Sequence, residues 1–162
     1  MTISIFSDIK GLVKIAFGLK ILLMFKFFKS TFFTKRKFKR INSSLNAKFK
    51  IISGKNPKNT SSIINSIAKN ISLNGLCLET SLVQSDGLHI SHDSSMMTKN
   101  KLDIEIELPN KNDKDEILDV IHILGRVTWY DKKTNYQYFP FEVGIDILEI
   151  SDEDFLKLKT FI

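Results

Sequence analysis

From about residue 44 onward, hydrophobic and polar residues alternate along much of the chain. The stretch 102–108, LDIEIEL, places Leu and Ile on one face and three acidic residues on the other. Successive side chains of a β-strand point to opposite faces, so this pattern predicts a half-buried strand. Polar stretches separate the candidate strands, which predicts a mainly β fold, an antiparallel barrel or sandwich of about six strands. The candidate strands are residues 45–51, 63–71, 75–80, 102–108, 117–130 and 141–147.

The last segment, 151–162, has the pattern of a helix. Ser151 can cap its N-terminus, Asp154 follows three residues later, and the first turn is acidic, which suits the positive end of the helix dipole. Hydrophobic residues recur at helical spacing. We expect this helix to close one end of the barrel through Phe155, Leu158 and Ile162.

Residues 7–33 also have largely helical periodicity, with lysines distributed among Phe, Leu, Ile and Met. No uncharged run in this segment exceeds five residues, whereas a membrane span needs about 20. Two interpretations remain open for this N-terminal helix. It can lie on an anionic membrane surface with its lysines reaching the headgroups, or it can pack on the domain or on a second copy of the chain.

The positive charge is concentrated at the N-terminal end. Residues 1–50 contain 12 Lys and Arg against one acidic residue, Asp8, which gives +11, whereas residues 51–162 contain 12 against 17, which gives −5. A nucleic-acid-binding domain would more often carry a basic face on its folded body. The distribution favours a local anionic partner, either a small phosphate ligand or a membrane surface. It argues against a barrel that binds single-stranded nucleic acid.

Catalytic and metal-binding patterns are sparse. The single cysteine, Cys77, excludes an intramolecular disulfide and a paired CxxC zinc site, and its apolar surroundings predict a small buried side chain. The histidines at 89, 92 and 122 have no diagnostic ligand spacing. The chain also lacks a glycine-rich phosphate loop, an HExxH pair and a GxSxG elbow. We therefore expect neither an enzyme, nor a metal site, nor a cofactor.

Two short motifs stand out from this background. The basic run KRKFKR, residues 35–40, contains Arg36 and Arg40 in an R-x-x-x-R pattern, and about thirty residues later comes the pattern N-x-S-x-x-G. In an extended strand, Asn70 and Ser72 would point to the same side, and Gly75 would permit a turn or a close backbone approach.

Together these motifs resemble the PilZ domain, a bacterial receptor for cyclic di-GMP. The resemblance continues downstream with Gly125, Arg126, Val127 and Trp129 in a G-[KR]-V-x-W strand, with Gly144 in the last strand, and with the terminal helix. It implies a six-stranded antiparallel barrel over residues 35–162, preceded by a separate segment, 1–34.

The resemblance also implies roles for five residues. Arg36 and Arg40 would contact guanine and phosphate through planar, bidentate guanidinium groups, and Asn70 and Ser72 would form hydrogen bonds from the barrel side. Gly75 would keep the surface open. The neighbouring lysines would add salt-sensitive attraction.

The function implied is a cytoplasmic receptor whose N-terminal arm changes conformation when cyclic di-GMP binds and relays the signal to a partner. Residues 1–34 would provide a peripheral contact with the inner membrane or a protein contact. The alternative is a degenerate PilZ adaptor that mediates protein contacts without nucleotide.

Overall fold

The computed structural model describes residues 38–92, 98–109, 118–134 and 138–162. Contacts divide the chain into two units, Met1–Lys37 and Phe38–Ile162, and the fold below is that of the second. The expected N-terminal helix lies outside the described residues. In the described ranges, no helix is long and apolar enough to cross a membrane.

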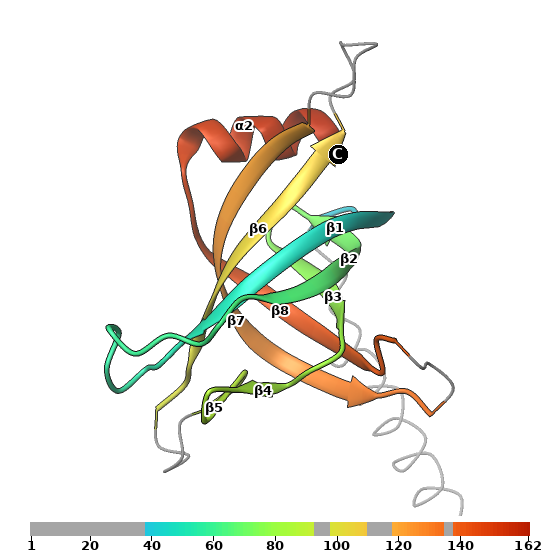
Figure 1. The fold of residues 1–162 in the computed structure, drawn as a ribbon. Helices are drawn as coiled ribbons and strands as arrows, with labels where there is room; N and C mark the ends of the chain where they lie inside the picture. The colour runs from blue at the N-terminus through green and yellow to red at the C-terminus, as the bar shows by residue number, and fades with distance from the viewer. Residues whose placement is uncertain (1–37, 93–97, 110–117, 135–137) are drawn as a thin grey trace, which may run out of the picture. The chain divides into compact units, whose positions relative to one another are not determined.

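Six antiparallel strands form a closed barrel in the order β1-β2-β3-β8-β7-β6 (Figure 1). The predicted mainly β fold with a six-stranded barrel and a C-terminal helix is therefore confirmed. Two further short strands, β4 and β5, form a separate two-stranded sheet. The strands are β1 (Ile41–Ile52), β2 (Ile64–Ser72), β3 (Gly75–Thr80), β4 (Gln84–Ser85), β5 (Leu88–His89), β6 (Lys101–Pro109), β7 (Leu118–Lys132) and β8 (Phe141–Ile150), and the helix is α2 (Asp152–Phe161).

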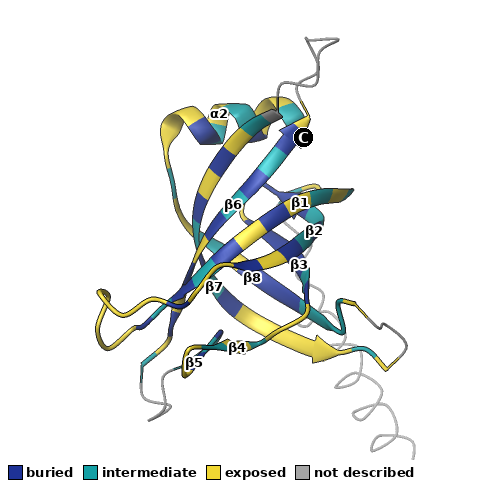
Figure 2. Cartoon of the chain, in the orientation of Figure 1, coloured by how far each residue is buried: buried dark blue, intermediate teal, exposed yellow. Residues whose placement is uncertain are grey.

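Residues that alternate between hydrophobic and polar in the sequence also alternate between buried and more exposed positions in the structure. Figure 2 shows this along β6 and β1. In β6 the four aliphatic residues at 102, 104, 106 and 108 are buried, while the intervening acidic residues are exposed or half-buried. Phe49 and Ile51 of β1 point into the same core. Burial of these side chains supplies most of the driving force for closing the barrel.

The helix α2 lies across one end of the barrel (Figure 1). Ser151 is its N-cap, as expected, because the Ser151 hydroxyl accepts a hydrogen bond from the Asp154 N–H at 3.1 Å. The Asp154 carboxylate also accepts a bond from the His122 N–H of β7 at 3.2 Å. Leu158 is buried in the core, and Ile162 packs against it together with Phe161. Phe155 itself is half-buried.

Residues 84–89, expected as part of a polar loop, form the β4–β5 hairpin. Asp86 and Gly87 connect its strands, and both have positive φ, 50° and 75°. Two consecutive residues with positive φ suit the twist of a tight hairpin, and Asp-Gly is a favoured pair there.

Candidate functional site

Strand pairing places the end of the first motif next to the second motif. Ile41 pairs with Ile71, and Asn42 pairs with Asn70. Arg40 immediately precedes Ile41 and is exposed, so the continued register directs it toward the end of β2 that carries Ser72. Arg36 lies outside the described residues. Of the two arginines, Arg40 is thus placed beside the second motif, across one pair of strands.

Asn70 lies at an irregularity of β2. The β2–β3 register shifts between Ala68 and Asn70, and Asn70 then pairs with Cys77. Its Oδ1 atom is buried, and among the described residues it has no hydrogen-bond partner. A buried carbonyl oxygen without a partner costs about 1–3 kcal/mol, so this atom can accept a bond from a group outside the described residues.

Ser72 is fully buried, and its hydroxyl is engaged within the chain. Its oxygen lies 2.9 Å from the Gly75 carbonyl oxygen and 2.9 Å from Asn74 Oδ1, both of which are acceptors. These contacts fix the turn between β2 and β3. In this conformation Ser72 shapes the end of β2 and does not present a free hydroxyl at the surface, which differs from the arrangement expected for a ligand contact.

Gly75 begins β3 opposite Asp146 of β8. A Cβ atom built at Gly75 would lie 2.6 Å from the Ile145 carbonyl oxygen. The glycine is therefore required by the close approach of β3 and β8, and the sequence motif reflects this packing as well as any ligand contact.

Trp129, which is not among the five expected site residues, lies on the same face as Asn70. Asn70 pairs with Cys77, Cys77 with Gly144, and Gly144 with Trp129, so these residues form one row across β2, β3, β8 and β7. Trp129 is 44% exposed, and its ring lies over Gly144, where a Cβ atom would be 2.0 Å from Nε1. We refer to these four residues as the Asn70–Trp129 row. The sequence predicted a strand position for Trp129, but only the register places it in the same row as Asn70.

Cys77, in the middle of this row, is 3% exposed, as predicted. Burial raises the pKa of its thiol. A protonated thiol is a poor nucleophile, so Cys77 serves as a small packing residue.

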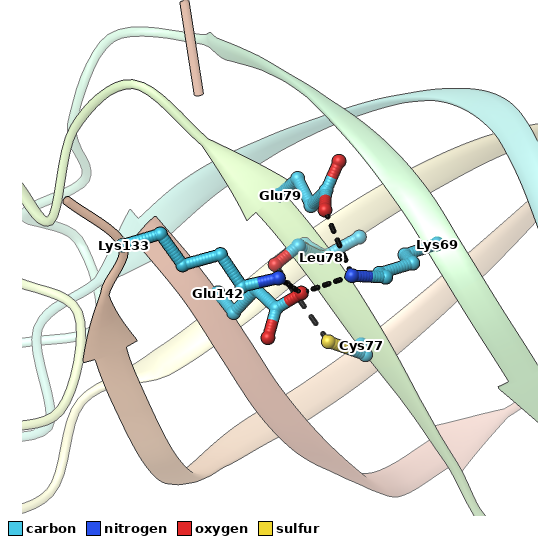
Figure 3. A network of polar contacts seen from close by, with 6 residues as sticks. All are labelled: Lys69, Cys77, Leu78, Glu79, Lys133 and Glu142. Atoms are coloured by element: carbon cyan, nitrogen blue, oxygen red, sulfur yellow. Dashed lines mark hydrogen bonds and ion pairs between the residues drawn. The ribbon is translucent and has the colours of Figure 1, made fainter. Parts of the chain in front are cut away.

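An ion-pair network braces the strands next to the bulge (Figure 3). Lys69 Nζ contacts Glu79 at 3.2 Å and also forms an ion pair with Glu142, which Lys133 contacts as well. The hydrogen bond to Glu142 raises the pKa of Lys69. Although burial acts to raise the pKa of Glu142, the bonds from the two lysines hold that pKa below its usual value. The network joins β2, β3 and β8 next to Asn70.

A histidine cluster involves none of the four residues of the row. The rings of His89 and His92 stack with centroids 4.5 Å apart, and Tyr130 meets His89 edge-on at 5.4 Å. Among the described side chains, no group of three or more His, Cys, Asp or Glu could hold a metal ion. A depression of about 350 Å³ is lined by side chains of β1, β2 and β6, including Asn46, Asn65 and Glu105. Of the predicted site residues that the structure describes, none lines it.

A family model and one solved structure agree with this architecture. The family model described as "PilZ domain" matches residues 34–162. The structure of the Bacillus subtilis inhibitor of motility, MotI/DgrA, has a TM-score of 0.51 and 18% identity over 79% of this chain and 49% of that one. The PilZ domain of YcgR from Escherichia coli, solved with c-di-GMP, has a TM-score of 0.48 and 13% identity, over 78% of this chain and 87% of that one. The chain thus spans about half the length of the Bacillus protein. No curated protein matches the chain.

Proposed function

Because the chain belongs to the PilZ domain family, we propose that it is a cytoplasmic receptor for cyclic di-GMP. The dinucleotide would bind on the outer face of β2, β3 and β8, along the Asn70–Trp129 row. The arm that carries Arg36 and Arg40 would close over it from the end of β1. The protein would act by binding and would need neither a catalytic group nor a cofactor.

The observation that carries this proposal is the unpartnered Oδ1 atom of Asn70, two residues before Ser72 and next to the strand that begins after Arg40. Guanine has N–H groups that can donate a hydrogen bond to such an oxygen. A bond from the ligand would offset the cost of the buried carbonyl in the free protein.

Charge and shape support the same ligand. Each guanidinium group can donate two parallel hydrogen bonds to guanine O6 and N7 or to phosphate oxygens, a geometry that lysine cannot copy. The exposed face of the Trp129 indole offers a surface on which a base can stack. The lysines between the arginines would attract the two phosphate charges over a longer range.

The signal would pass through the N-terminal arm. Residues 35–40 lead directly into β1, so a ligand that holds Arg36 and Arg40 would also restrain the chain that precedes them. Residues 1–34, with their lysines and apolar residues, would then engage an anionic inner membrane surface or a protein partner in one state and be withdrawn from it in the other.

A second candidate, an adaptor that binds no nucleotide, is favoured by one observation. The Ser72 hydroxyl is buried and engaged within the β2–β3 turn, so it would have to leave these bonds in order to contact a ligand. In an adaptor, the barrel would contact its protein partner equally well with and without cyclic di-GMP.

Isothermal titration calorimetry with cyclic di-GMP on the full chain separates the two candidates. We expect saturable binding by the wild type, loss of binding in Arg36→Ala and Arg40→Ala, and unchanged binding in Lys55→Ala, an exposed control in the β1–β2 loop. A wild-type protein that binds no cyclic di-GMP would exclude the receptor and leave the adaptor.

The relay needs a separate measurement. Sedimentation of the full chain with vesicles that contain anionic lipid, at increasing cyclic di-GMP concentration, should show a change in the bound fraction. If the bound fraction stays constant while calorimetry detects the ligand, the arm does not control membrane contact.

A further inference from the structure

We propose that Asp146 of β8 reads the base edge of the bound dinucleotide and makes the site selective for guanine, an inference that rests on the proposed function. The sequence motifs assign no role to this residue. Its position follows from two pairings, because Asp146 lies opposite Gly75 of β3 and opposite Arg126 of β7.

Asp146 belongs to the same face as the Asn70–Trp129 row. It follows Gly144 by two positions in β8, and residues two apart in a strand point to the same side, about 7 Å from one another. The Trp129 indole lies over Gly144. The carboxylate therefore stands in the next outward-facing row, beside the indole.

The surface between Asp146 and the β2–β3 turn carries no side chain at Gly75. Gly75 itself is buried, so a flat group would lie on the exposed Trp129 indole. Residues two apart in a strand are about 7 Å from one another, so the edge of this group would come within reach of the Asp146 carboxylate. The turn is tied to β8 at this point, because the Ile147 N–H donates a hydrogen bond to the Asn74 carbonyl oxygen at 3.0 Å. Asp146 is thus held in a fixed position relative to the motif Asn70–Gly75.

The Asp146 side chain is exposed and has hydrogen-bonding capacity to spare. It is 53% exposed, and Arg126 Nη2 lies 3.9 Å from its Oδ2. That distance is too long for a hydrogen bond, so this ion pair leaves both carboxylate oxygens open to other donors. An exposed ion pair of this length adds little to the stability of the fold. A purely structural role therefore does not explain why both charged residues are present.

The chemistry of the base selects guanine. Its Watson–Crick edge presents the N1–H and N2–H₂ donors side by side, and a carboxylate can accept both. Adenine presents a lone pair at N1, which a carboxylate repels. Arg126 would offset the repulsion between Asp146 and the ligand phosphates, so the carboxylate adds selectivity at a small cost in affinity.

A matched pair of ligands isolates this contact. Cyclic di-IMP keeps O6, N7, N1–H and both phosphates but lacks the N2 amine, so contacts from the arginines should be the same for both nucleotides. We expect the wild type to bind cyclic di-GMP about tenfold more tightly than cyclic di-IMP, since a hydrogen bond to a charged group is lost. In Asp146→Asn, which removes the charge and keeps the size, the ratio should fall to about twofold or less.

Calorimetry on the full chain gives both affinities, and Asp103→Asn on β6, an exposed strand carboxylate outside this face, should keep the wild-type ratio. Equal affinities of the wild type for the two nucleotides, or an unchanged ratio in Asp146→Asn, would overturn the role of Asp146 and leave the receptor standing. A wild type that binds neither nucleotide would overturn the receptor itself.

Discussion

The indole ring of Trp129 lies against the backbone of Gly144 on the neighbouring strand. A Cβ atom at Gly144 would come within 2.0 Å of Nε1 and 2.2 Å of Cε2, so the ring occupies the space that any other residue at 144 would fill. The ring is thereby held flat on the sheet with part of its surface exposed. This contact joins β7 to β8 and sets one end of the Asn70–Trp129 row.

Replacing Gly144 by alanine should displace the ring. We expect the free energy of unfolding to fall by about 1–3 kcal/mol, since added volume at a tight contact forces neighbours to move. Trp129 is the only tryptophan in the chain, so its fluorescence emission reports the displacement directly. Glu149→Ala, at an exposed position of the same strand, is the control. An unchanged emission spectrum in Gly144→Ala would contradict the packing described.

Removing the indole should weaken ligand binding. If a base stacks on Trp129, Trp129→Ala should lower the affinity for cyclic di-GMP by about tenfold or more, and Trp129→Phe should retain part of it, because stacking on an aromatic ring contributes about 1–3 kcal/mol per base. Tyr138→Ala removes an aromatic side chain that is 83% exposed and lies outside the row. Equal losses in the tryptophan and tyrosine variants, measured by calorimetry, would argue against stacking.

Asn70→Ala should lower the affinity for cyclic di-GMP and leave the free energy of unfolding nearly unchanged. The substitution removes a buried oxygen without a partner, so the free protein should lose little or no stability in urea denaturation, whereas affinity for cyclic di-GMP should fall by about tenfold or more. Asn100 is the matched control. It is fully buried, and its side chain bonds to the backbone of Gly54, His89 and His92. Asn100→Ala should therefore cost at least about 2 kcal/mol. Similar stability losses in the two variants would show that Asn70 is an ordinary structural residue.

Arginine and lysine in the basic arm should not be equivalent. Arg40→Lys keeps the charge but loses the bidentate geometry, so we expect a loss of affinity of about tenfold or more that persists at high salt. Lys39→Ala should weaken binding modestly, and the difference should vanish as salt screens the charge. Calorimetry at low and high salt measures both effects. If Arg40→Lys binds like the wild type, the arm acts through charge alone.

Acid should weaken the network around Glu142. The lysine contacts hold the pKa of Glu142 below its usual value despite its burial, so its charged form stabilises the fold above the ordinary glutamate pKa of about 4.3. This contribution is lost as the pH falls through the lower pKa of the folded state. The stability difference between the wild type and Glu142→Gln in urea denaturation should therefore shrink between about pH 6 and pH 3. A constant difference would mean that the ion pairs contribute no net stability.

Local patterns were sufficient for the main strands, because one buried face and one solvent face force hydrophobic alternation. The stretch LDIEIEL became β6, and Ser151 capped α2 as its sequence indicated. The β4–β5 hairpin was missed because two-residue strands carry no periodicity, although the pair Asp86-Gly87 was a usable turn signal. Helical spacing predicted that Leu158 and Ile162 contact the core, but it did not show that Phe161 packs there as well.

The sequence alone determined the strand pattern, the capped terminal helix and the two motifs, all of which are encoded by neighbouring residues. Only the tertiary structure decided how strands distant in sequence align. Its register placed Asn70, Cys77, Gly144 and Trp129 in one row and Asp146 beside Gly75. It also buried Ser72 inside its turn and left Asn70 Oδ1 without a partner in the described part of the chain. Register depends on bulges and on packing across the whole barrel, and no local pattern carries that information.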